Sequence, residues 1–238
     1  MRAAKTGGDD RVEFLVDRSI YATREAASLV RKHSRLGGAV TLDLQHHYSG
    51  PIQALYWIEL CRDRAYGHHD LVRRIDAAFP AALRAMRQVL PADGPLSLVS
   101  LGPGDGEIDI RLLRHLERSE ELHGYLGVVF SFGLLAFAVN RILRSSRLST
   151  RFPVRAIFGD FTALSPRALD VAGRATHRLF SLTGFTLGNY AEPALLRRMA
   201  GSRGASRSRT VRDISSASNM VISFGLAISW SIFPSFMM

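Results

Sequence analysis

The stretch Leu96-Ser-Leu-Val-Ser-Leu-Gly-Pro-Gly-Asp-Gly-Glu107 decides the fold of this chain. Its apolar first half, Leu96 to Leu101, stops abruptly at the segment Gly102-Pro103-Gly104-Asp105-Gly106. A helical pattern follows, with apolar residues on one face at Ile108, Ile110, Leu112, Leu113 and Leu116. The order strand, glycine-rich loop, helix is typical of α/β folds. Glycines at such a turn let a ligand approach the main chain near the helix N-terminus, where free N–H groups favour electron-rich groups.

Two common phosphate-binding motifs do not fit this loop. No Gly-Lys-Ser/Thr follows it, as a P-loop requires, and the third glycine of a dinucleotide fingerprint should fall three residues after the second. A tight strand-to-helix turn that binds nothing is the alternative interpretation. The density of glycines, three within the five residues 102–106, favours a ligand-binding loop.

Length and composition fit one α/β domain with a substantial core, since 47% of the 238 residues are hydrophobic. The single cysteine, Cys61, excludes an internal disulfide, fits a reducing compartment and is expected to be a small buried apolar residue. Residues 1–12 are polar and charged and show no signal peptide, so we expect a cytoplasmic protein. The formal net charge of +10 comes almost entirely from arginines scattered along the chain, which favours a solvated basic surface over a nucleic-acid site.

The first 95 residues are expected to be a mostly helical segment. Residues 1–18 are polar and are predicted to be poorly ordered at the start. Helices are predicted over 20–33, from Pro51 onwards, and from Asp70 to about Leu90. Asp70 is the expected cap of the last of these helices, and Pro80 is expected to kink or divide it.

From Leu96 the pattern changes to alternating strands and helices, which predicts a parallel sheet with right-handed crossovers over a domain spanning 96–200. Strands are predicted over 96–101, 125–130, 154–158 and 178–183, and helices over 107–117, 132–143, 166–172 and 192–199. The last part, 201–238, begins with a basic low-complexity linker and ends in an uncharged apolar tail. That tail is interpreted as a strand beside the fourth strand or a disordered end, although its length alone would allow a membrane span.

The Gly-x-Gly-x-Gly loop after a strand resembles the first motif of class I S-adenosylmethionine-dependent methyltransferases. In that family the loop wraps the methionine part and the ribose of the cofactor, which implies this role for residues 102–106. The family's second strand ends in an acidic residue that holds both ribose hydroxyls, whereas Val129 stands at the matching position here. Ala156-Ile-Phe-Gly-Asp-Phe161 resembles the third motif, so the resemblance implies that Asp160 and Phe161 meet the adenine.

A second stretch, Leu179-Phe-Ser-Leu-Thr-Gly-Phe-Thr-Leu-Gly-Asn-Tyr190, narrows the resemblance. It resembles the Gly-Ser-Thr-x-Gly-Asn segment of the histidine-specific methyltransferases of ergothioneine synthesis, with Phe185 in place of the serine. In that family the asparagine binds the amino-acid substrate, so Asn189 is the implied substrate ligand. A turn asparagine after Gly188 is the alternative. The resemblance covers about 84–200, and the chain is expected to be incomplete or altered beyond it.

Together these features predict a Rossmann-like class I methyltransferase sheet of strand order 3-2-1-4, with residues 220–230 as a surrogate fifth strand. The predicted function is methyl transfer from S-adenosylmethionine to a nitrogen, with histidine or a related amino acid as the small-molecule acceptor. The alternatives are a non-catalytic relative and a basic nucleic-acid-associated protein. No catalytic base is assigned. No metal site is expected, because His46-His47 and His68-His69 lack the i, i+4 spacing of helical ligands.

Overall fold

The computed structural model describes residues 12–16, 50–88, 96–118, 122–145, 152–161, 164, 168–169, 177–183 and 218–224. Its strands are β1 (Val12–Val16), β2 (Leu96–Leu101), β3 (Leu122–Val129), β4 (Val154–Phe158), β5 (His177–Thr183) and β6 (Ser218–Phe224). Its helices are α2 (Pro51–Arg62), α3 (His68–Arg87), α4 (Glu107–Arg118) and α5 (Phe132–Arg144), with the short 3-10 helix η2 (Arg64–Tyr66) between α2 and α3.

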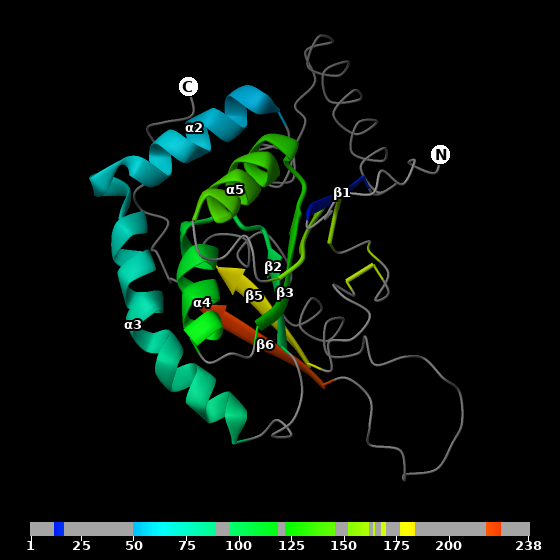
Figure 1. Ribbon diagram of the computed structural model, residues 1–238. Helices are drawn as coiled ribbons and strands as arrows, with labels where there is room; N and C mark the ends of the chain where they lie inside the picture. The colour runs from blue at the N-terminus through cyan, green and yellow to red at the C-terminus, as the bar shows by residue number, and fades with distance from the viewer. Residues whose placement is uncertain are drawn as a thin grey trace, which may run out of the picture.

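All described strands belong to one sheet of order β1-β4-β3-β2-β5-β6, and every neighbouring pair is parallel. Counted from β2, the strands therefore lie in the order third, second, first, fourth, which confirms the predicted Rossmann-like α/β sheet. Because all strands run in the same direction, their carboxyl ends meet at one edge of the sheet (Figure 1). The glycine-rich loop leaves β2 at that edge.

The sheet has a hydrophobic core on each face, as is usual for all-parallel sheets. Leu96 and Leu98 of β2 belong to the core under α4 and α5, whereas Val99 and Leu101 belong to a second core on the opposite face. All six residues of β2 are buried, so this strand is the centre of the fold. Helices α4 and α5 lie against the first face, and α2 and α3 form a further layer outside them (Figure 1).

The N-terminal strand β1 is a correction to the sequence analysis. A poorly ordered start is predicted for residues 1–18, and this is wrong for 12–16, which form an edge strand. Strand β1 pairs in parallel with β4, and Arg155 Nε of β4 donates a hydrogen bond to Glu13 Oε2 over 2.6 Å. So short a strand is stable only when added to an existing sheet edge, which local sequence patterns do not show.

Helix α3 corrects two further expectations. It begins directly after Gly67, so Asp70 lies in the first turn and is not the cap. Pro80 lies inside the helix and does not divide it. Proline in a helix interior removes a hydrogen bond and clashes with the preceding turn. Here Phe79 before it and Met86 after it are buried in the same core, and this packing holds both halves in one helix.

The strand predicted in the tail is confirmed in the part that the structure describes. Residues 218–224 form β6 and pair in parallel with the whole of β5, from His177 beside Ser218 to Thr183 beside Phe224. Within the described residues, no helix has the length and hydropathy needed to cross a membrane. The helices predicted over 20–33, 166–172 and 192–199 lie wholly or largely outside the described residues.

Candidate functional site

The 102–106 loop turns the chain from β2 into α4. Gly102, Gly104 and Gly106 have φ values of 76°, 58° and 78°, a left-handed conformation that other residues rarely adopt. The main chain of the loop is anchored by several hydrogen bonds, among them one from Arg141 Nη1 to Asp105 O over 3.1 Å. Gly102 N donates to Val128 O of β3 over 2.8 Å, and Gly106 N donates to Pro103 O over 2.9 Å. The conformation of the loop therefore requires all three glycines.

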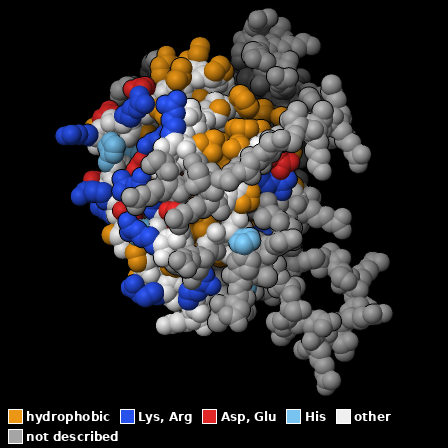
Figure 2. All heavy atoms as spheres, viewed as in Figure 1, with side chains coloured by type: hydrophobic (Ala, Val, Ile, Leu, Met, Phe, Trp, Pro, Cys, Tyr) orange, Lys and Arg blue, Asp and Glu red, His pale blue; other side chains and the backbone are white. Residues whose placement is uncertain are grey.

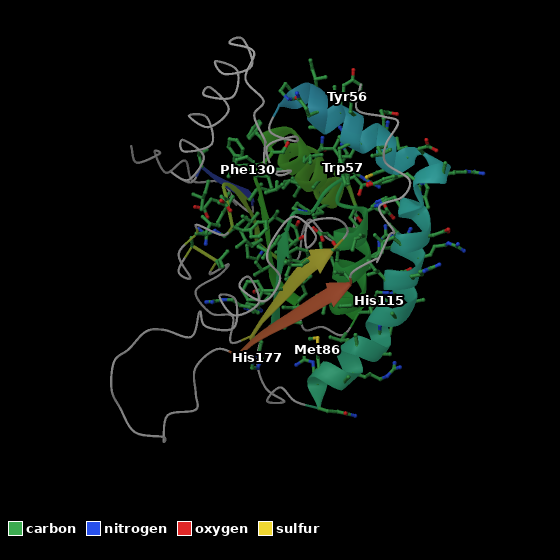
Figure 3. The ribbon with its side chains drawn as sticks, turned by 180° about the vertical axis from the view of Figure 1, so that it is seen from behind. Tyr56, Trp57, Met86, His115, Phe130 and His177 are labelled. Carbon is green, nitrogen blue, oxygen red and sulfur yellow. The ribbon has the colours of Figure 1, made fainter. Side chains whose placement is uncertain are left out.

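The surroundings of Gly104 and Gly106 differ. A Cβ on Gly106 would lie 3.0 Å from Ala138 Cα and 3.2 Å from Ala138 O, so this glycine lets the start of α4 pack against α5. Among the described residues, a Cβ on Gly104 would meet one atom within 4 Å, Trp57 Nε1 at 3.5 Å, which is an ordinary contact. The packing of the described residues therefore leaves one side of Gly104 open. Trp57 of α2 lies beside this opening and packs with residues of α5 (Figure 3).

The carboxylate of Asp105 is buried and bonded within the protein. Its Oδ1 accepts a hydrogen bond from Glu107 N over 3.1 Å and its Oδ2 one from Arg141 Nη1 over 2.7 Å, while His68 Nε2 lies 3.4 Å from Oδ1. Burial alone would raise the pKa of Asp105, but these three partners together hold it below its ordinary value of 3.8. Asp105 therefore supplies, from within the chain, the negative charge that the start of α4 favours.

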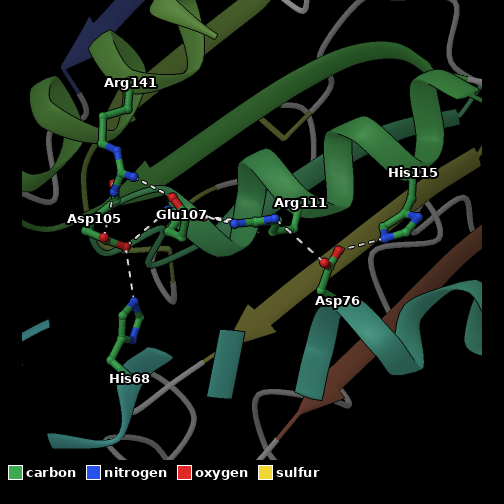
Figure 4. A network of polar contacts seen from close by, with 7 residues as sticks. All are labelled: His68, Asp76, Asp105, Glu107, Arg111, His115 and Arg141. Atoms are coloured by element: carbon green, nitrogen blue, oxygen red, sulfur yellow. Dashed lines mark hydrogen bonds and ion pairs between the residues drawn. The ribbon is translucent and has the colours of Figure 1, made fainter. Parts of the chain in front are cut away.

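Asp105 is one member of a chain of alternating charges that connects the loop with α3, α4 and α5 (Figure 4). The chain runs through His68, Asp105, Arg141, Glu107, Arg111, Asp76 and His115. Arg141 is its central member, because its guanidinium bonds the carboxylates of both Asp105 and Glu107. The sequence gives no sign of this contact, since Arg141 and Asp105 are 36 residues apart.

Residues Val129, Asp160 and Phe161 lie at the same edge of the sheet as the loop. Val129 is the last residue of β3, and its side chain offers no acceptor for a ribose hydroxyl. Its carbonyl accepts a hydrogen bond from Gly159 N over 3.1 Å, which ties the ends of β3 and β4 together. Asp160 follows β4 and is half-buried, whereas the Phe161 ring is buried in the second core.

A second carboxylate is fully buried behind the loop. Asp109, in the first turn of α4, accepts hydrogen bonds from Tyr125 Oη over 2.6 Å and from Ser100 Oγ over 2.9 Å. Burial raises the pKa of Asp109 to about 7 although both hydrogen bonds act to lower it. Burial also raises the pKa of Tyr125 well above 10. These three side chains tie α4 to β2 and β3.

The remaining candidates are the proposed substrate ligand, the histidine pairs and the single cysteine. Asn189 and the pair His46-His47 lie outside the described residues. Cys61 is 2% exposed, and burial raises the pKa of its thiol to about 12, which confirms a small buried residue without nucleophilic character. In the described parts of the chain, no group of three or more His, Cys, Asp and Glu side chains is placed to hold a metal ion.

No protein-family model and no curated protein matches this chain. Several solved structures resemble it at low identity. An uncharacterized protein from Burkholderia thailandensis is 17% identical with a TM-score of 0.34, over 75% of this chain and 42% of that one. Magnesium protoporphyrin IX methyltransferase from Synechocystis with bound SAH is 15% identical with a TM-score of 0.32, over 69% of this chain and 58% of that one. The same enzyme with bound SAM is 12% identical with a TM-score of 0.33, over 78% of this chain and 72% of that one.

The chain thus spans 42% and 58% of the lengths of the first two structures. At these identities and TM-scores the likeness carries no conclusion for this chain, whose fold is shown by its own strand order. The narrower resemblance to histidine-specific methyltransferases gains no support from these three structures. It rests on the residues 179–190 of the sequence.

Proposed function

We propose that this chain binds S-adenosylmethionine at the 102–106 loop and transfers its methyl group to a nitrogen of a small molecule. The observation that supports this most is the open side of Gly104, at the carboxyl edge of a parallel sheet, where open α/β sheets bind their ligands. The resemblance of the loop to the first motif of class I methyltransferases supports the same cofactor.

Each residue of the proposed cofactor site has a distinct part. The main chain of residues 102–104 approaches the methionine part and the ribose of the cofactor. Asp105 and Gly106 act by position, because Asp105 fixes the loop through its buried carboxylate and Gly106 lets α4 approach α5. Asp160 accepts a hydrogen bond from the amino group of adenine, and Phe161 supports that edge from the core.

The chemistry of the transfer demands little covalent help from the protein. S-adenosylmethionine supplies an electrophilic methyl group on a sulfonium. The protein aligns the lone pair of the acceptor nitrogen with that methyl group and excludes water. We propose that the amide of Asn189 holds the acceptor, because it offers two donors and one acceptor. Histidine or a related amino acid α-amine is the acceptor that the resemblance of residues 179–190 favours.

A non-catalytic relative of the methyltransferases is the alternative, and Val129 is the observation that favours it. A valine at the end of β3 cannot accept the ribose hydrogen bonds, so cofactor affinity is expected to be weak. A nucleic-acid-associated protein has no comparable support. The basic side chains are spread along the side of the molecule that α3 forms, with acidic ones between them (Figure 2). Several also pair with carboxylates, as Arg73 does with Asp70.

The proposed cofactor loop is tested by Gly104→Val. The valine side chain fills the open side of Gly104, so we expect the affinity for S-adenosylhomocysteine to fall at least about 100-fold, equivalent to about 2.7 kcal/mol. The fold should lose only about 1–2 kcal/mol, the cost of a left-handed conformation for a residue with a Cβ. Isothermal titration calorimetry measures the affinity, and urea unfolding measures the stability.

Gly67→Val is the matched control for this change. Gly67 has a φ of 76°, no atom of the described residues lies within 4 Å of its Cβ position, and it is not part of the loop. Valine there introduces the same backbone strain and should leave the affinity for S-adenosylhomocysteine within about two-fold of wild type. Equal affinity of Gly104→Val and wild type would remove the loop from the proposed site.

The weak point of the proposed site is tested by Val129→Asp. A carboxylate at the end of β3 can accept hydrogen bonds from both ribose hydroxyls, so we expect S-adenosylhomocysteine to bind about ten-fold tighter after desolvation is deducted. The asparagine of Val129→Asn has nearly the same shape as aspartate but no charge. Its gain in affinity for S-adenosylhomocysteine should be smaller, because a charged acceptor forms stronger hydrogen bonds. If the folded Val129→Asp chain binds no better than wild type, Val129 does not face the ribose.

A further inference from the structure

A cavity of about 590 Å³ lies on the helical side of the molecule, between α2, α3, α4 and α5. Among the described residues that we assign to the cofactor, only Asp105 lines it, and Gly104 does not. Its basic lining residues are Arg62, Arg111, Arg141, Arg144, His68 and His69. Two carboxylates, Asp105 and Glu107, also line it, and Glu59 and Asp76, which do not, pair with Arg62 and Arg111.

The charges of the cavity are unevenly paired. Both carboxylates are bound at its inner end, where Arg141 bonds Asp105 and Glu107 and where Arg111 also bonds Glu107. At the mouth, Arg62 contacts only the exposed Glu59 of its own helix. Arg144 forms no ion pair within the parts of the chain that the structure describes. Of the four guanidinium groups, only that of Arg144 is therefore without an ion pair among the described residues, and the partner of Arg62 is an exposed carboxylate.

The N-terminus of α3 adds an independent feature to this cavity. Helix α3 is 20 residues long, and its cap, Gly67, has no side chain to bond the first N–H groups. His68, the first helical residue, lines the cavity with a side chain that is only 10% exposed. Its Nε2 faces Asp105 Oδ1 over 3.4 Å, so this nitrogen already has a partner within the protein. The uncapped start of the helix, beside it, favours an anion.

We propose that this cavity is a second ligand site, which binds a small molecule carrying a phosphate monoester on an apolar group. The phosphate meets the guanidinium group of Arg144, which has no ion pair among the described residues, and that of Arg62, whose partner is an exposed carboxylate. Guanidinium groups fit phosphate oxygens through paired N–H donors. Ile58 and Phe137 provide an apolar wall for the organic part of the ligand. This site does not depend on the proposed methyl transfer.

Phenyl phosphate is the probe for this site, titrated calorimetrically into the 238-residue chain at an ionic strength of about 50 mM. Inorganic phosphate and phenol test its two parts separately. We expect saturable binding of phenyl phosphate, binding of inorganic phosphate at least about three-fold weaker, and no saturable binding of phenol up to about 10 mM. Absence of saturable phenyl phosphate binding, or equally tight binding of phenol, would overturn the proposal.

The position of the site is tested by the double variant Arg62→Gln/Arg144→Gln. Both residues lie at the mouth of the cavity, and we expect the affinity for phenyl phosphate to fall at least about ten-fold. Arg84→Gln/Arg118→Gln is the matched control, since it removes the same charge from two exposed positions that do not line the cavity. Its effect should stay below about two-fold. Equal losses in the two double variants, or no loss in the first, would show that the anion is not held in this cavity.

Discussion

Raising the pH from about 4 to about 7 is expected to reduce the free energy of unfolding by about 3 kcal/mol through Asp109 alone. Burial between α4, β2 and β3 raises the pKa of this carboxyl from its ordinary value of 3.8 to about 7. The folded chain therefore keeps a proton over a pH range in which the unfolded chain has released it. The stabilising contribution is complete below about pH 4 and is lost as the pH rises through about 7.

Asp109→Asn isolates this contribution, because it removes the ionisation and keeps a group of the same shape between Tyr125 and Ser100. Urea unfolding of both proteins from about pH 4 to about pH 7.5 should show wild type losing stability relative to the variant. In the difference between the two proteins, the contributions of the other titrating groups to stability cancel. Among them is His177, whose pKa is lowered mainly by burial. Its contribution to the free energy of unfolding is lost as the pH falls. A constant difference between the two proteins across this range would contradict the buried ionisation.

The second large effect concerns the contact between the 102–106 loop and α5. Gly106→Ala is expected to lower the free energy of unfolding by about 3 kcal/mol. About 1–2 kcal/mol of this comes from a left-handed conformation that a residue with a Cβ resists. The remainder comes from a clash, because the new Cβ would lie 3.0 Å from Ala138 Cα, a backbone atom that cannot rotate away.

Gly67→Ala separates these two causes. Its φ of 76° is nearly that of Gly106, but no atom of the described residues lies within 4 Å of its Cβ position. This variant should therefore lose only about 1 kcal/mol in urea unfolding. The difference of about 2 kcal/mol between the two variants measures how closely the loop packs against α5. Equal losses would mean that α5 moves aside at little cost.

The proposed site is predictable from the sequence where its signals are local. The strand β2, the glycine loop and the helix α4 follow one another without interruption, so a change from an apolar run to helical periodicity is sufficient to place them. The same holds for β3, β4 and β5, each of which ends within two residues of its expected end. Val129 stands at the end of β3 as predicted, since strand ends fix which residues meet at the carboxyl edge of a parallel sheet.

The chain of charges around Asp105 has no such local signal. The sequence analysis places Asp105 in the cofactor loop, but it does not show that the carboxylate is bonded to Arg141 on α5 and lies near His68 on α3. Each of these partners is separated from it by a full structural element. The cavity between the four helices is likewise invisible in the sequence, because its arginines come from α2, α4 and α5.

The sequence by itself therefore determined the alternation of strands and helices, the order of the central strands, the loop at the carboxyl edge and the tail strand beside β5. The strand order was expected from the resemblance to class I methyltransferases, and the other features follow from hydrophobic periodicity, from turn residues and from the need of a sheet edge for a partner. Only the tertiary structure decided that residues 12–16 extend the sheet, that α3 continues through Pro80 and that Asp105 is bonded within the protein. Each of these depends on contacts between residues far apart in the chain, whose packing outweighs local preference.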